Sequence, residues 1–413
     1  MVVQKNVNEC GVCGSDQLEV QIEIPRYYYL VRPTEFKNVW RDVPLSVGVC
    51  RNCGMSLQLA LPNQNALNEI YNEYYGSYPS FTSDVETDER HTEFKKYIGK
   101  SGVKFEGCAL EIGSFNGKFL ATLKSEGMGV QGCDPNRAAA EFALETFGIE
   151  TEDAYFDADT FDADSFDLVS ARLVLEHVPK PSVFLAGLAK VVKAGGYIAI
   201  EVPDCSELMA NGVEFWMVEH FSFFTPSTLL RALRMHGFDG VVTSHKSILR
   251  VVAKKMVHEF AATDDVAATD DVKAALAFRE NYNATVKTYN DIFDQARSMN
   301  TSIGVYGVGN FFTNLMSSSN LEFVDIVGLF DGNAGKWDVD IEGLGLAIKG
   351  PDNLEPGLIG LIVVATQSYQ GVVDRITPYL ENGGTALVAL PHPHVITASP
   401  NSADEAKYSP IQK

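Results

Sequence analysis

Between residues 108 and 255, short apolar runs of strand length recur at intervals long enough to hold a helix. The segment 118–126 after the first run has helical character. Strands separated by helical lengths indicate a mostly parallel sheet covered by helices. The predicted strands are Cys108–Ile112, Val130–Cys133, Phe166–Ser170, Tyr197–Val202 and Leu249–Lys254.

A second alternation of the same kind begins at residue 302. A turn with Gly307 and Gly309 follows its first strand and leads into a helix. We therefore expect an α/β protein in which residues 66–255 form a central Rossmann-like domain and residues 301–400 a C-terminal Rossmann-like domain. The predicted C-terminal strands are Ile303–Tyr306, Val324–Phe330, Leu361–Ala365 and Thr385–Leu390.

The segments outside the two alternations differ in character. Residues 1–65 contain short β-like runs, and residues 64–100 look helical, with a tyrosine-rich stretch around Tyr75 and Tyr78. Residues 256–300 are polar and helix-prone, and they repeat Ala-Thr-Asp-Asp-Val at 262–266 and 268–272. We interpret them as an exposed helical linker. From His392 the chain is polar, and we expect it to be frayed.

The length and charge of the chain limit its partners. Its 413 residues suggest two or three domains. The formal net charge of −21 opposes binding to nucleic acid, because that binding depends on clustered Lys and Arg. No apolar run reaches the roughly 20 residues of a membrane helix, and the first residues lack the apolar core of a signal peptide. We expect a cytoplasmic monomer or small homo-oligomer that acts on a small molecule.

Four of the seven cysteines form two CxxCG knuckles about 36 residues apart. Paired CxxC units in a cytosolic chain favour a metal over disulfides. Four thiolates suit tetrahedral zinc and leave no open position for water. We predict a structural zinc site in an N-terminal domain, residues 1–65, rather than a nucleic-acid zinc ribbon, which the acidic charge opposes. The ligands are Cys10, Cys13, Cys50 and Cys53.

A glycine-bearing turn follows the first strand of the central domain. Gly113 and Gly117 remove side chains where a ligand approaches the backbone, and Glu111 ends the strand. One strand later, Asp134 is placed to accept ribose hydroxyls. The alternative, a Rossmann domain for NAD, would have the third glycine of GxGxxG, which is missing.

The Glu-x-Gly-x-x-x-Gly form resembles the first motif of class I methyltransferases, which implies S-adenosylmethionine as cofactor. Asp153 and Ala154 follow Asp134 at the distance along the chain where proteins of that class contact the adenine of the cofactor. A methyl transfer to carbon also requires a base and a group that holds an enolate. Glu219 and His220 lie among aromatic residues, and apolar surroundings bring a histidine pKa near neutrality, as a base requires.

The whole layout resembles the nucleotide-sugar C-methyltransferases, a family of 3-C-methyltransferases that act on dTDP-4-keto-deoxysugars. The cysteine knuckles, the tyrosine stretch, the sequence Leu-Glu-His-Val at 175–178 and the Glu219 segment carry this resemblance. It implies that His220 is the base that removes a proton next to a ketone. It implies that Glu219 orients His220 or binds substrate, and that His177 and either Tyr75 or Tyr78 line the sugar pocket.

By the same resemblance, the C-terminal domain would help to hold the nucleotide diphosphate through Gly307, Gly309, Asn310 and Lys336. Other roles stay open, because His177 and the tyrosines would also serve in packing and the two glycines would also shape a turn. Two other functions stay open as well. One is an O- or N-methyltransferase for another small metabolite, since the family's tyrosine before the Glu-His pair is missing here. The other is a non-enzymatic scaffold protein.

Overall fold

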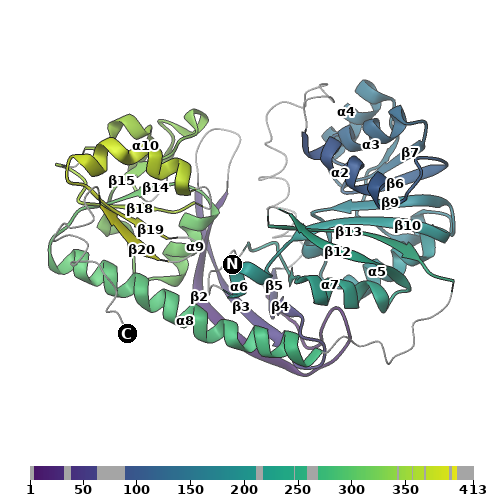
Figure 1. The fold of residues 1–413 in the computed structure, drawn as a ribbon, viewed down its shortest axis with the longest axis horizontal. Coiled ribbons are helices and arrows are strands. Elements are labelled where there is room, and N and C mark those ends of the chain that lie inside the picture. The colour runs from purple at the N-terminus through teal and green to yellow at the C-terminus, as the bar shows by residue number, and fades with distance from the viewer. Residues whose placement is uncertain are drawn as a thin grey trace.

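The computed structural model describes residues 4–31, 39–62, 89–210, 217–245, 247–257, 268–341, 344–355, 357–366, 369–389 and 393–397. Two sheet-centred units stand on either side of a long N-terminal hairpin, and one long helix runs along all three (Figure 1). The predicted fold class is confirmed, because both sheets of the α/β units are mostly parallel.

The N-terminal part is built on a four-stranded antiparallel sheet in the order β11-β4-β3-β2. The hairpin of β2 (Leu18–Val31) and β3 (Val39–Cys50) is its main feature. Strand β4 (Ser56–Gln58) follows the second knuckle, and β11 (Ser222–Phe223) comes from the central domain. Strands β1 (Gln4–Asn6) and β5 (Ala60–Pro62) form a separate antiparallel pair.

The central unit has seven strands in the order β12-β13-β10-β9-β6-β7-β8, and only β13 runs antiparallel to its neighbours. The strand order reverses between β6 and β9, and ligands of open α/β sheets bind outside the carboxyl ends of the strands at such a switch point. The strands are β6 (Cys108–Ile112), β7 (Gly129–Cys133), β8 (Thr151–Glu152), β9 (Phe166–Arg172), β10 (Val192–Pro203), β12 (Phe238–His245) and β13 (Ile248–Lys255).

Helices cover this sheet, and their ends follow local sequence signals. The side chain of Asn136 accepts the amide of Ala139 at the start of one helix, and Pro181 begins another. The helices are α2 (Glu89–Lys100), α3 (Lys118–Ser125), α4 (Arg137–Phe147), α5 (Pro181–Val191), α6 (Ser206–Ala210) and α7 (Pro226–Arg234), with 3-10 turns η2 (Ala158–Thr160) and η3 (Leu175–His177).

All five predicted strands of the central unit are confirmed, as is the helix after the first. The short edge strand β8 and strand β12 were not predicted. Strand β12 is amphipathic and largely exposed, so it lacks the continuous apolar run of a buried parallel strand. Of the predicted helical segment 64–100, the described part from residue 89 onward is helix α2, and the tyrosine stretch lies outside the described residues.

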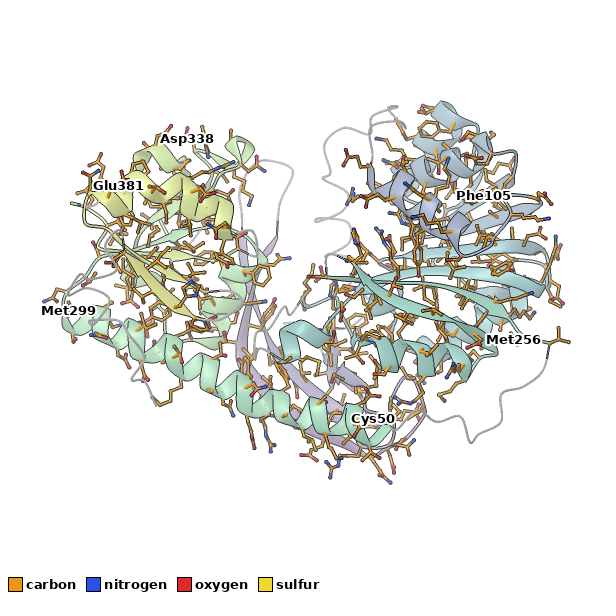
Figure 2. All side chains as sticks on the ribbon, in the orientation of Figure 1. Cys50, Phe105, Met256, Met299, Asp338 and Glu381 are labelled. Atoms are coloured by element: carbon orange, nitrogen blue, oxygen red, sulfur yellow. The ribbon has the colours of Figure 1, made fainter. Side chains whose placement is uncertain are left out.

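Helix α8 (Ala268–Ser298) corrects the expectation of an exposed linker. One face of the helix is buried along its whole length, with spacings of three and four residues. Phe278 and Tyr282 pack on the N-terminal sheet, whereas Ile292 and Phe293 pack into the C-terminal core. The helix is therefore a strut between these two parts (Figure 2). The sequence analysis missed this apolar face because residues 268–298 are polar on average. The first repeat, 262–266, lies outside the described residues.

The C-terminal unit is a second Rossmann-like sheet in the order β16-β17-β15-β14-β18-β19-β20. Its five central strands are parallel, and the two edge strands pair antiparallel. The elements are β14 (Ile303–Tyr306), α9 (Asn310–Ser318), η4 (Phe323–Asp325), β15 (Ile326–Phe330), η5 (Ala334–Lys336), β16 (Asp340–Ile341), β17 (Leu346–Lys349), η6 (Pro351–Asn353), β18 (Leu361–Val364), α10 (Tyr369–Glu381), β19 (Thr385–Val388) and β20 (His394–Thr397).

The expectation of a frayed tail is wrong for residues 394–397, because β20 pairs with β19. The long hairpin also fixes the C-terminal unit to the rest. The Tyr27 hydroxyl donates to Asn314 Oδ1 at 2.8 Å, and the Tyr28 amide donates to the Ser317 hydroxyl oxygen at 2.7 Å. Strand β2 therefore packs against helix α9. Among the described residues, no helix combines the length and apolarity that crossing a membrane requires.

Candidate functional site

The predicted cofactor residues gather at the carboxyl ends of β6, β7 and β8. Glu111 lies near the end of β6, and Gly113 follows with φ +71°. A Cβ at Gly113 would lie 2.5 Å from Val174 Cγ2, so this turn has no room for a side chain. Gly117, with φ +72°, begins α3, where a Cβ would lie 2.8 Å from Ala143 Cβ. Gly117 therefore also permits close packing of α3 and α4.

Asp134 is fixed at the end of β7 by two backbone amides. The amide of Phe115 donates to Oδ2 and the amide of Asn136 to Oδ1, both at 2.8 Å. Burial raises the pKa of this carboxyl group. Asp153 and Ala154 follow β8, and the Cys133 thiol donates to the Ala154 carbonyl at 3.4 Å. The structure thus brings these candidates to one edge of the sheet.

Arg172, Glu201 and Arg250 form a charge network on neighbouring strands of the same sheet, which the sequence analysis did not predict. Glu201 accepts from Arg172 Nε at 2.8 Å through one oxygen and from Arg250 Nε at 2.7 Å through the other. The Arg172 guanidinium lies 4.9 Å from the ring centroid of Phe119. Burial raises the pKa of Glu111 to about 8, and the nearby charge of Arg172 opposes the rise. The only sequence signal was a glutamate inside the apolar strand 197–202.

The predicted histidines lie together. The rings of His177 and His220 form a T-shaped contact with 4.7 Å between centroids. Nδ1 of His177 lies 2.9 Å from the Glu219 carbonyl oxygen. A carbonyl only accepts, so Nδ1 carries the hydrogen, and in the uncharged ring Nε2 is the nitrogen without one. His177 lies in η3, and His220 lies in the turn before β11. His177 and Glu219, the residue before His220, are 42 positions apart in the chain.

Burial keeps both rings neutral. It lowers the pKa of His177 to about 4, and burial together with His177 lowers the pKa of His220 well below its usual range. The carboxyl groups shift the other way, because burial raises the pKa of Glu219 to about 7 and that of Glu176 to about 8. The two candidate tyrosines, Tyr75 and Tyr78, lie outside the described residues.

Glu176 is a further residue of this centre that the sequence analysis did not single out. Its side chain is 1% exposed, and neither carboxyl oxygen has a hydrogen-bond partner within the described part of the chain. One oxygen lies 3.9 Å from His177 Nε2. Its carboxyl, both histidine rings and the neighbouring Glu219 thus form one buried titratable centre.

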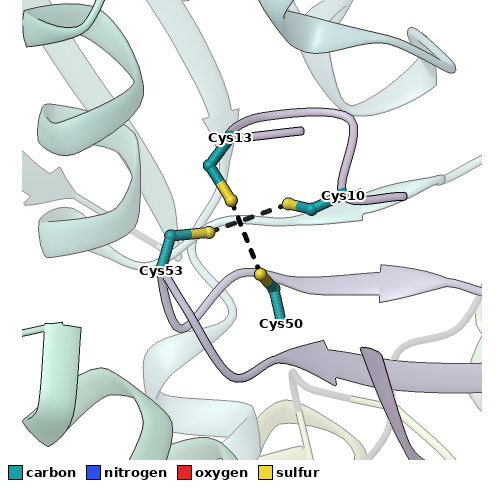
Figure 3. Close-up of side chains that lie close together, drawn as sticks. All are labelled: Cys10, Cys13, Cys50 and Cys53. Carbon is teal, nitrogen blue, oxygen red and sulfur yellow. Dashed lines mark hydrogen bonds between the residues drawn. The ribbon is translucent and has the colours of Figure 1, made fainter. Parts of the chain in front are cut away.

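The four knuckle cysteines converge on one point (Figure 3). Cys10 Sγ lies 3.7 Å from Cys53 Sγ, and Cys13 Sγ lies 3.5 Å from Cys50 Sγ. These separations exceed a disulfide bond of about 2.05 Å. They are close to the sulfur–sulfur distance of about 3.8 Å that four Zn–S bonds of about 2.3 Å produce in a tetrahedron. The donor set and its geometry therefore fit zinc.

The cluster also touches the central domain and helix α8. The amide of Ser182 donates to the Gly11 carbonyl at 2.9 Å. Arg231 donates to the Cys53 carbonyl at 2.6 Å and to Asp271 at 2.8 Å. The knuckles therefore join three parts of the chain.

The C-terminal candidates follow β14 and β15. Gly309 and Asn310 begin helix α9, and a Cβ at Gly309 would meet nothing within 4 Å. Gly307 has φ +99°, and a Cβ there would lie 2.7 Å from the Ala365 carbonyl oxygen, so it permits a tight turn. Lys336 Nζ donates to Asp331 at 2.8 Å and to the Val308 carbonyl at 2.9 Å. Its ammonium group thus ties the loop after β14 to the end of β15.

Comparisons with known proteins match part of the chain to a methyltransferase family. Residues 88–243 match the family described as Methyltransferase domain. The C-methyltransferase NovU of Streptomyces niveus is 26% identical over 422 residues, which cover 96% of this chain and 98% of that protein.

Solved S-adenosylmethionine-dependent methyltransferases are similar to part of the chain. The one from Mesorhizobium loti is 17% identical, with a TM-score of 0.35, over 41% of this chain and 100% of that one. The one from Aquifex aeolicus is 18% identical, with a TM-score of 0.34, over 43% and 100%. On its family match, its full-length relative and its four-cysteine cluster, the chain is an S-adenosylmethionine-dependent methyltransferase of class I fold that resembles the sugar C-methyltransferases.

Proposed function

We propose that this enzyme methylates the carbon next to a ketone on a nucleotide-diphosphate-linked deoxysugar. The observation that carries the proposal is the direct contact between the ring of half-buried His177 and that of buried His220. Transfer to an oxygen or nitrogen acceptor does not require removal of a carbon-bound proton. The uncharged imidazole is in its proton-accepting form at neutral pH. Its pKa lies below the near-neutral value expected from the sequence, because burial disfavours the charged ring, and this makes it a weaker base.

In this mechanism, a ring nitrogen of His220 accepts the proton from the carbon beside the ketone. The electron pair of that C–H bond moves to the carbonyl oxygen and forms an enolate. When bound at the carboxyl ends of β6 and β7, S-adenosylmethionine would supply the methyl group. The enolate carbon would form the new C–C bond as the methyl–sulfur bond breaks, so that the ketone is restored and S-adenosylhomocysteine leaves. His177 keeps its Nδ1 hydrogen on the Glu219 carbonyl, which fixes its ring beside His220.

Further roles follow from the same centre. Glu219 orients the histidines or binds substrate, and the carboxyl of Asp134 accepts the ribose hydroxyls of the cofactor. The family resemblance assigns the sugar to Tyr75 or Tyr78, both of which lie outside the described residues. Cys10, Cys13, Cys50 and Cys53 hold a structural zinc ion, and the C-terminal unit holds the nucleotide diphosphate near Gly309, Asn310 and Lys336.

Hydrogen exchange in deuterium oxide tests the proposal. A dTDP-linked 4-keto-deoxysugar and S-adenosylhomocysteine are mixed with enzyme, and NMR follows deuterium entry at the carbon next to the ketone. We expect exchange with the wild type and with H245A, which removes an exposed histidine on β12, but not with H220A. Methyl transfer without exchange would instead indicate an oxygen or nitrogen acceptor. Exchange that survives in H220A would disprove the base assignment.

A further inference from the structure

Gln58, at the end of β4, reaches from the four-cysteine domain to the backbone of the histidine segment. Its side chain is 2% exposed. Its amide nitrogen lies 2.6 Å from the His220 carbonyl oxygen, 3.0 Å from that of Met217 and 3.3 Å from that of Val218. An amide nitrogen carries two hydrogens, so at least one of them is shared between two of the three carbonyl oxygens.

The backbone of β4 also forms hydrogen bonds with residues 221–223. The Gln58 amide donates to the Phe221 carbonyl at 3.0 Å, and β11 pairs with β4 through Ser222 and Phe223. On the other side, the Phe221 amide donates to the Glu176 carbonyl at 2.7 Å. Residues 217–223 are therefore held between a strand of the four-cysteine domain and the turn that carries His177.

The cysteine cluster fixes the position of β4. The strand begins three residues after Cys53, and the Cys50 amide donates to the Met55 carbonyl at 2.9 Å. Gln58 therefore lies five positions after the last cysteine, and the four-cysteine domain contacts the histidine segment through β4.

We propose that Gln58 is a positioning residue that sets the place of the His220 ring through the backbone of residues 217–220. This rests on the proposed function of His220 as base. Removal of the amide leaves three carbonyls without their shared donor inside the protein, and the turn shifts to find others. A shift of about 1 Å in a reacting group costs about 100-fold in rate.

The first test compares Q58L with Q21L in the deuterium exchange assay. Gln21 is a matched control, because it is buried in the same sheet but donates only to the Glu19 carbonyl of its own strand, at 3.4 Å. We expect Q58L to lower the exchange rate about 100-fold, with unchanged affinity for S-adenosylhomocysteine and unchanged metal content. Q21L should exchange at the wild-type rate. Wild-type exchange in Q58L would overturn the proposal.

A second variant guards against misfolding of Q58L. In Q58E, a carboxylate would face the three carbonyls, whereas its protonated form would donate to one of them. Exchange in Q58E should therefore recover as the pH falls, opposite to the loss expected when a base is protonated. A Q58E rate that stays at the wild-type level across pH would contradict the role of the amide.

NMR of the histidine rings separates this proposal from the proposed function. The chain has eight histidines, and the spectra of H177A and H220A assign the two ring signals. We expect Q58L, and not Q21L, to move or broaden the Hε1 signals of His177 and His220 in the absence of substrate. Unmoved signals would overturn the positioning role. Moved signals together with full exchange in H220A would leave Gln58 as a positioning residue and disprove the base.

Discussion

The rings of His177 and His220 meet in a T-shaped contact, 4.7 Å apart between centroids, inside the protein. This contact makes each ring part of the other's environment. A proton on one ring disfavours a proton on the other, because two like charges would share a buried site. His177 is accordingly one cause of the lowered pKa of His220.

The pH dependence of the reaction should reflect this pair. Since the pKa of His220 lies well below 6.5, the proposed base is unprotonated at neutral pH and stays so as the pH falls through 6.5. We expect kcat/KM for the methyl transfer to stay level over that range and to fall only in more acidic solution. In H177N, the acid limb of the kcat/KM profile should move upward. A wild-type limb at or above pH 6.5 would contradict the neutral pair.

Asp134, the proposed ribose-binding residue, has a structural counterpart that serves as its control. Asp331, at the end of β15, accepts the amides of Val308 and Asn333, as Asp134 accepts those of Phe115 and Asn136. We expect D134N to lower the affinity for S-adenosylhomocysteine about 10- to 100-fold, because a charge-assisted hydrogen bond to ribose is lost.

D331N removes the same pair of backbone contacts in the other unit, so calorimetry should give it wild-type affinity. The two carboxylates differ in one respect, since Lys336 pairs with Asp331. Equal loss of affinity in both variants would mean that the backbone contacts, rather than a ribose contact, set the effect.

Loss of a knuckle cysteine should remove one metal ion per chain. We expect elemental analysis to find one zinc ion per wild-type chain and none in C13S. The thermal midpoint of C13S should fall, since Ser182 and Arg231 of the central domain donate to backbone carbonyls of the knuckles. C108S changes an exposed cysteine and should keep both the metal and the midpoint. Full metal content in C13S would refute the four-cysteine site.

The strut role of helix α8 predicts unequal effects along its two faces. Phe278 is 2% exposed and packs on the N-terminal sheet. F278A should lower the free energy of unfolding by about 3–5 kcal/mol, because it leaves a cavity. K287A, on the exposed face, should change it by about 0.5 kcal/mol or less. Denaturant titration measures both, and similar values for the two variants would argue against the buried face.

The sequence alone determined the features that depend on local pattern. The buried strands of both Rossmann-like units appear as apolar runs, because both faces of a parallel sheet are covered. The CxxCG spacing is equally local, and so is the positive φ that favours glycine at positions 113 and 117. The pairing of His177 with His220 was expected only through the family resemblance.

Tertiary structure decided the contacts between distant positions. Gln58 and His220 are 162 residues apart, and Arg172 and Glu201 are 29 apart. No periodicity marks such pairs, because their partners are chosen by how sheets and turns meet. The buried residues of α8 recur every three or four positions, which is a local signal. They are buried because the N-terminal sheet and the C-terminal core both pack against that face of the helix. The fold thus follows from short-range pattern, and the assembly of the reactive centre from packing across domains.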